Sequence, residues 1–91
     1  MKIIYDDNFL KNFLNIWDFI ALDSKVNANR FKKELKQQIE NLPLFPYKFR
    51  QSIYFEEKNI RDLIFKGYTI PYKIEEERII ILGIKKYTQD F

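Results

Sequence analysis

The 91-residue chain contains neither cysteine nor histidine. Without cysteine it has no disulfide framework, no thiolate zinc site and no cysteine nucleophile. Without histidine it lacks the commonest general base, the commonest protein metal ligand and any catalytic triad built on imidazole. We therefore expect neither a metal nor a cofactor.

Glycine and proline are scarce as well, and long hydrophobic segments are missing. The chain has 2 Gly and 3 Pro, and apolar residues make up 46% of it, a composition typical of a compact globular domain. No apolar run approaches the ~20 residues of a membrane span, and Asp6 and Asp7 make the start too acidic for a signal peptide. We expect a cytoplasmic protein with a single domain over residues 1–91, because hydrophobic cores rarely divide in chains below roughly 150 residues.

The charge balance is only mildly basic, whereas aromatic residues are abundant. The net charge is +3, from 16 basic and 13 acidic residues, which is well short of what marks a dedicated DNA-binding domain. Nine Phe, six Tyr and one Trp make up 18% of the chain. Each buried aromatic removes on the order of 150–250 Å² from water, so a few of them can carry a small core.

The first predicted helix follows a short strand candidate at residues 2–5 and begins at a cap formed by Asp7 or Asn8. Its apolar side chains recur at spacings of three and four: Phe9, Phe13, Ile16, Trp17 and Ile20. Leu10 and Leu14 widen the same stripe. The pattern predicts a helix with a broad apolar face, in which Trp17 is a core residue.

A second predicted helix follows the polar break at residues 23–24 and ends at Pro43. One face of it is apolar, with Ala28, Phe31, Leu35, Ile39 and Leu42. Lys32, Lys33 and Lys36 form a basic stripe elsewhere on this helix, which we interpret as an ordinary exposed face because acidic residues are interleaved with it. Two helices joined by so few residues are expected to form an antiparallel hairpin.

The second half of the chain predicts strands. Residues 51–55 favour a short strand, and runs at 60–66, 68–74 and 78–85 favour an antiparallel meander because only short breaks separate them. Pro71 cannot donate to a ladder, so we expect a local irregularity there. The last run is apolar on both faces, so it is either covered on both sides or keeps one face for a partner. The expected fold is α+β: a short amino-terminal strand, a helical hairpin and a three- to four-stranded antiparallel sheet.

Four short motifs occur in order along the chain: FLNIWDFI at 13–20, RDL at 61–63, GYTIPY at 67–72 and IILGI at 80–84. They resemble, respectively, the DL-x-x-IW-x-Y, (I/V)-R-x-L and GYR-(I/V)-x-Y segments and the last hydrophobic strand of the ParE/RelE superfamily of bacterial toxins. The resemblance extends over nearly the whole length and is closer to the ParE branch.

This resemblance implies the toxin of a type II toxin–antitoxin module, of the plasmid-stabilisation type, together with a cognate antitoxin that wraps it. RelE-type members cut messenger RNA in the ribosome and carry an arginine after the tyrosine of GYR, where this chain has Thr69. Threonine cannot supply the positive charge that steadies a transition-state phosphate. We therefore favour a non-enzymatic ParE-like inhibitor of DNA gyrase. The alternatives are a ribosome-dependent, metal-independent endoribonuclease and a degenerate toxin that is kept only as a binding partner.

Five residues are candidates for binding the target or its phosphates: Arg61, Lys66, Lys85, Lys86 and Tyr87. We expect them to gather at the strand ends on one side of the sheet and to hold phosphate oxygens. In the nuclease alternative Lys86 and Tyr87 are the catalytic candidates, because metal-free RNA cleavage needs a base for the 2′-hydroxyl and an acid for the leaving oxygen. The competing interpretation is a solvated charged rim with an aromatic side chain packed at the sheet edge.

Overall fold

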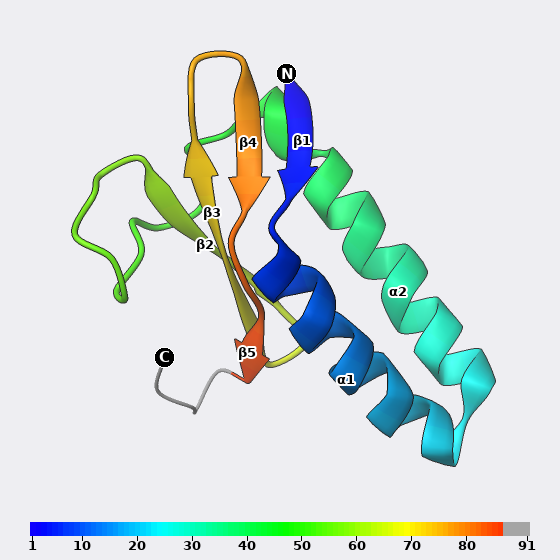
Figure 1. Cartoon of the computed structure of the whole chain (residues 1–91). Helices are drawn as coiled ribbons and strands as arrows, with labels where there is room; N and C mark the ends of the chain where they lie inside the picture. Colours follow the sequence, from blue (N-terminus) through cyan, green and yellow to red (C-terminus); the bar gives the residue numbers. More distant parts are fainter. Residues whose placement is uncertain (87–91) are drawn as a thin grey trace.

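The computed structural model describes residues 1–86, and it places two helices beside a five-stranded sheet (Figure 1). The elements in chain order are β1 (Lys2–Tyr5), α1 (Asp7–Asp23), α2 (Lys25–Glu40), the 3₁₀ helix η1 (Leu42–Leu44), β2 (Ile60–Phe65), β3 (Tyr68–Ile74), β4 (Arg78–Ile81) and β5 (Lys85–Lys86). The expected α+β order of strand, helical hairpin and sheet is confirmed.

A single serine joins the two helices of the hairpin. The backbone N–H of Ser24 donates to the carbonyl of Ile20 at the end of α1, and its Oγ accepts from the backbone N–H of Asn27 at the start of α2. The cap of α1 is Asp6 rather than Asp7 or Asn8, because Asp6 keeps an extended backbone and its carboxylate accepts from the Asn8 N–H. In the described part of the chain, neither helix has the length and apolarity that a membrane span requires.

The second helix ends at Glu40, two residues before the last member of its predicted apolar stripe. Asn41 caps it, and the chain then tightens into η1 with Pro43 near the start of this short helix. Proline is tolerated there because the first amides of a helix have no intrahelical partner. Pro43 therefore lies inside a new helical turn instead of directly ending α2.

The sheet has the strand order β1-β4-β3-β2, with β5 paired to β3. It is mixed and not purely antiparallel, because β1 runs parallel to β4 with Lys2 opposite Arg78. β4 lies between β1 and β3, and its two faces are buried to different extents. Ile79 and Ile81 are buried in the main core, and Ile80 is half-buried on the opposite face.

Pro71 marks the irregularity that was expected, and it splits the last predicted strand in two. The carbonyl of Pro71 accepts from the N–H of Leu82 at 2.9 Å. The amide and carbonyl of one strand residue point to the same side of the strand. The position where Pro71 lacks an N–H therefore also faces the segment that contains Leu82. Regular pairing stops there after Ile81 and resumes where Lys85 lies opposite Thr69.

The strand predicted at 51–55 is wrong. Only Gln51 forms an isolated bridge, with Arg61. The N–H of Ile53 donates to the Asp62 carboxylate at 3.2 Å, and the N–H of Tyr54 donates to Ser52 Oγ at 3.2 Å. Side-chain acceptors therefore take the amides that a ladder needs. The other two predicted strands are confirmed as β2 and β3, which are separated by a turn at Lys66 and Gly67, both with positive φ.

A chain of aromatic contacts links the hairpin to the sheet. Tyr5 contacts Phe9, Phe9 contacts Phe13 and Phe13 contacts Phe31, with ring centroids 5.6 to 6.2 Å apart. Phe31 then meets Phe65 on β2 at 5.5 Å. These separations lie within the range of favourable offset and edge-to-face packing. This series of ring contacts therefore fixes the hairpin on the sheet.

Candidate functional site

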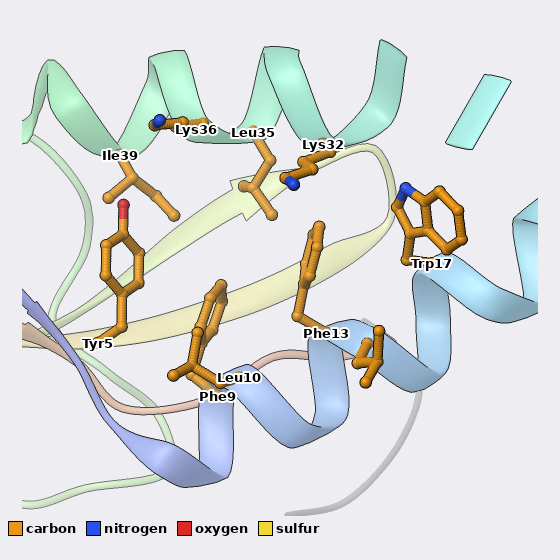
Figure 2. A pocket seen from close by; sticks show the side chains of 10 residues that line it. Tyr5, Phe9, Leu10, Phe13, Trp17, Lys32, Leu35, Lys36 and Ile39 are labelled. Atoms are coloured by element: carbon orange, nitrogen blue, oxygen red, sulfur yellow. The ribbon is translucent and has the colours of Figure 1, made fainter. Parts of the chain in front are cut away.

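An apolar groove runs between α1 and α2 and has a cavity volume of about 550 Å³. Ten residues line it: Tyr5, Phe9, Leu10, Phe13, Leu14, Trp17, Lys32, Leu35, Lys36 and Ile39. Figure 2 shows the side chains of the two helices pointing toward each other across it, with Tyr5 at one end and Trp17 at the other. The floor is the buried core of the hairpin, including Leu35 and Ile39.

The groove exposes large aliphatic side chains to solvent. Leu10 is 49% exposed and Leu14 is 57% exposed. They lie one helical turn apart on α1, so they form a continuous strip along one wall. A contiguous apolar surface of this kind, rimmed by charged groups, is typical of a protein–protein contact. Trp17 belongs to this strip and is half-buried, so the prediction that it is a core residue is wrong.

The charged groups in the groove are all basic. Lys32 and Lys36 lie on α2 at the edge of the groove, and Figure 2 shows their aliphatic stems beside Leu35. Lys36 forms a weak, exposed ion pair with Glu40 at 3.8 Å, whereas Lys32 has no ion pair within residues 1–86. The interpretation of this lysine stripe as an ordinary exposed face is therefore incomplete, because two of its members border a cavity. Burial raises the pKa of Tyr5, with a smaller contribution from Glu40, so this phenol stays neutral.

The predicted phosphate-binding cluster is only partly assembled. Arg61 lies opposite Tyr72, whereas Lys85 and Lys86 lie opposite Thr69 and Tyr68. Tyr72 and Thr69 are three residues apart on β3, so Arg61 and Lys85 are offset by about 10 Å along the strand direction. Lys66 shares an end of the sheet with the two lysines, so Arg61 is the described candidate that stands apart. Tyr87 lies outside the described residues.

Two of these candidates are engaged within the fold. The Arg61 guanidinium donates to the carbonyl of Phe49 at 3.2 Å and lies 4.7 Å from the ring centroid of Tyr47. It therefore holds the segment that precedes β2. The ammonium group of Lys66 forms an ion pair with Glu34 of α2, which links the β2–β3 turn to the helical hairpin. Lys86 remains exposed, and its Nζ lies 6.0 Å from the ring centroid of Phe19.

Two further polar side chains are held within the fold. Glu75 lies in the β3–β4 turn, where hydrogen bonding to Arg78 lowers the pKa of its carboxyl group, with Lys73 nearby. Thr69, at the position of the RelE-type arginine, is completely buried. Within residues 1–86 no group of three or more potential metal-ligating side chains comes together.

Comparison with known families identifies this architecture. The model described as "ParE toxin of type II toxin-antitoxin system, parDE" matches residues 3–91. The chain belongs to the ParE toxin family. It is thus a toxin-family member of a type II toxin–antitoxin system, and such a system includes an antitoxin as its partner.

Two solved structures share the ParE-like fold of this chain. The chromosomal ParDE toxin–antitoxin system from P. aeruginosa matches with a TM-score of 0.77 and 19% identity, over 94% of this chain and 95% of that one. The solution structure of a conserved hypothetical protein from Helicobacter pylori matches with a TM-score of 0.57 and 18% identity, over 100% and 99%. At such low identity these likenesses show the fold alone. A search of curated proteins finds no match.

Sequence reasoning missed the groove of this ParE-family chain, although its signals are visible in retrospect. Leu10 and Leu14 widen the apolar stripe of α1 beyond what one packing face needs. Lys32 and Lys36 lie one turn apart on α2, which places them on one edge. Only the packing angle of the two helices shows that these residues border the same cavity.

Proposed function

We propose that this ParE-family toxin arrests growth by binding DNA gyrase, and that an antitoxin segment neutralises it by occupying the groove between α1 and α2. The observation that carries the antitoxin part of the proposal is the exposed strip of Leu10 and Leu14 beside Lys32. A toxin that spends most of its life in a complex tolerates such a surface because the partner covers it.

The chemistry of the groove favours a particular kind of antitoxin segment. Its apolar floor suits an amphipathic helix whose apolar side chains recur every three or four residues, as in other helix-in-groove complexes. Lys32 and Lys36 favour acidic side chains on the flank of that helix. A segment of this kind that is disordered when free folds as it binds, and burial of its apolar side chains offsets the ordering cost.

The state of the basic residues supports inhibition by contact over RNA cleavage. Arg61 is bound to Phe49 and stacked near Tyr47, and Lys66 is paired with Glu34. A metal-free nuclease needs its acid, its base and a phosphate-stabilising cation around one scissile bond. Lys85 and Lys86 line one groove together. Thr69 is buried at the position where RelE-type toxins carry their arginine, so residue 69 supplies no cation.

The target is tested by pulse-labelling DNA and protein synthesis after the chain is induced in cells that lack an antitoxin. We expect DNA synthesis to fall first and purified gyrase to accumulate cleaved DNA in the presence of the chain. An earlier fall in protein synthesis with intact gyrase activity would instead identify an mRNA-cutting toxin. Arrest of neither process would mean that the chain acts only as a binding partner.

The groove is tested separately, by calorimetric titration with the cognate antitoxin. Leu14→Glu is the informative variant, because its side chain is 57% exposed and its replacement leaves the core intact. Leu22→Glu is the matched control, because Leu22 is on the same helix, 87% exposed and outside the groove. We expect Leu14→Glu to weaken binding at least tenfold, by the ~1.4 kcal/mol or more that a desolvated contact residue contributes. Equal effects of the two changes would exclude this groove as the binding site.

A further inference from the structure

A second groove lies between α1 and β5, and its residues differ from those of the first. It has a volume of about 330 Å³. Eight residues line it: Asn12, Asn15, Ile16, Phe19, Tyr68, Ile84, Lys85 and Lys86. The proposed antitoxin groove shares none of these lining residues.

The floor and the walls of this second groove have different chemistry. Ile84 is buried at the bottom, with Ile16 and the ring of Tyr68 half-buried beside it. Asn12 and Asn15 supply amide groups from α1, and the two lysines supply positive charge from β5. No carboxylate is among the residues that line it. The groove therefore combines a flat apolar surface with donors, acceptors and cations.

The asparagines on α1 indicate a binding role, because asparagine has a low propensity for the interior of a helix. Asn8 has a structural reason, since its amide donates to the carbonyl of Leu82 at 3.3 Å. Asn12 donates to Asn8 at 3.5 Å. The Asn15 side chain has no hydrogen-bond partner within residues 1–86, although it lines the groove. An amide that both donates and accepts is suited to the edge of a nucleobase.

Phe19 adds an exposed aromatic surface at the same place. Its side chain is 67% exposed, and the Lys86 Nζ lies 6.0 Å from its ring centroid. Aromatic rings next to cations are what sequence-tolerant binders of single-stranded nucleic acid use, because every base has a face that stacks and every nucleotide carries a phosphate. An acidic peptide would use the lysines but has no need of an exposed ring or of paired amides.

We propose that the groove between α1 and β5 binds single-stranded nucleic acid. One base stacks on Phe19 above the apolar floor, the amides of Asn12 and Asn15 contact base edges, and Lys85 and Lys86 contact the adjoining phosphates. Double-stranded DNA does not fit this arrangement, because its base faces are stacked inside the helix. The proposal goes beyond gyrase inhibition and antitoxin binding, and it is measured on the isolated chain, so it stands or falls independently of both.

The test is fluorescence anisotropy of the full chain with labelled oligothymidylate and oligouridylate of about twelve nucleotides, and with a duplex of the same length. We expect both single strands to bind better than the duplex. Tighter binding of oligothymidylate would identify single-stranded DNA as the ligand, and tighter binding of oligouridylate would identify RNA. If two phosphates are neutralised, affinity should fall about sevenfold between about 50 and 200 mM salt, from a slope of about −0.7 for each phosphate.

Matched variants separate this groove from general attraction to a basic protein. Phe19→Ala should weaken single-strand binding at least fivefold, whereas Leu22→Ala, on the same helix outside the groove, should leave it unchanged. Lys86→Gln should reduce the salt slope by about 0.7, whereas Lys36→Gln, with the same change of charge in the first groove, should not. Preference for the duplex, equal effects of Lys86→Gln and Lys36→Gln, or no effect of Phe19→Ala would each overturn the proposal.

Discussion

Thr69 and Lys85 lie opposite each other across β3 and β5, and the threonine side chain is completely buried. The burial, and not the pairing itself, bears on the missing arginine after the tyrosine of the GYTIPY motif. A guanidinium placed at residue 69 would have to enter the packed sheet, and its charge would be removed from water. The departure from the RelE-type pattern is therefore consistent with the packing at this position.

Substitutions of Thr69 should affect stability in opposite directions. Within residues 1–86 the Thr69 Oγ1 is buried without a hydrogen-bond partner, so Thr69→Val should raise the free energy of unfolding by about 1 kcal/mol. Thr69→Arg should lower it by about 3 kcal/mol or more, because it buries an unpaired charge. Urea unfolding measures both changes. A clear loss of stability in Thr69→Val would show that its hydroxyl has a partner after all.

Tyr72 should make the stability of the chain depend on pH in the alkaline range. Its hydroxyl donates to the carbonyl of Pro46 at 2.6 Å, and burial raises its pKa from 10.0 to about 12. Between these values the unfolded chain loses the phenolic proton while the folded chain keeps it, so stability falls as pH rises through that window. Tyr72→Phe should cost about 1 kcal/mol at neutral pH and reduce the alkaline loss. The same alkaline loss in wild type and variant would contradict this assignment.

Gly67 should be required for the β2–β3 turn because of its backbone conformation alone. Its φ is +82°, and no heavy atom lies within 4 Å of the position that a Cβ would take. Gly67→Ala should therefore lower the free energy of unfolding by about 1–2 kcal/mol through backbone strain, without a clash. Gly67→Asn is the control, because asparagine tolerates this conformation better. An alanine variant as stable as wild type in thermal unfolding would mean that the turn adopts another conformation.

Lys32 should steer the antitoxin toward the first groove, if the proposed neutralisation is correct. Reversing its charge in Lys32→Glu should slow association by about tenfold at low salt and weaken the dependence of the rate on salt. Lys33→Glu makes the same change in net charge at the next residue of α2, outside the groove. Stopped-flow measurements compare the two variants. Equal rates for both would show that general attraction, and not the groove, guides the encounter.

Local patterns were enough to predict most of the elements. The three- and four-residue spacing of apolar side chains predicted both helices, and the missing amide of Pro71 predicted the interruption of the sheet beside it. The strand expected at 51–55 failed because two of its amides bond to side chains: the Ile53 amide to Asp62, with a sequence separation of 9, and the Tyr54 amide to Ser52. The composition of the run at 51–55 does not reveal that side chains take these amides.

The sequence by itself determined the family, the order of the elements and the absence of cysteine and histidine chemistry, because these depend on residue identity and on neighbours along the chain. Only the tertiary structure decided that Leu14 and Lys32 border one groove, that Phe19 and Lys86 border another, and that Arg61 stands apart from the lysines of β5. These relationships depend on strand register and on how helices pack. Both are set by contacts between distant segments, and local periodicity does not contain them.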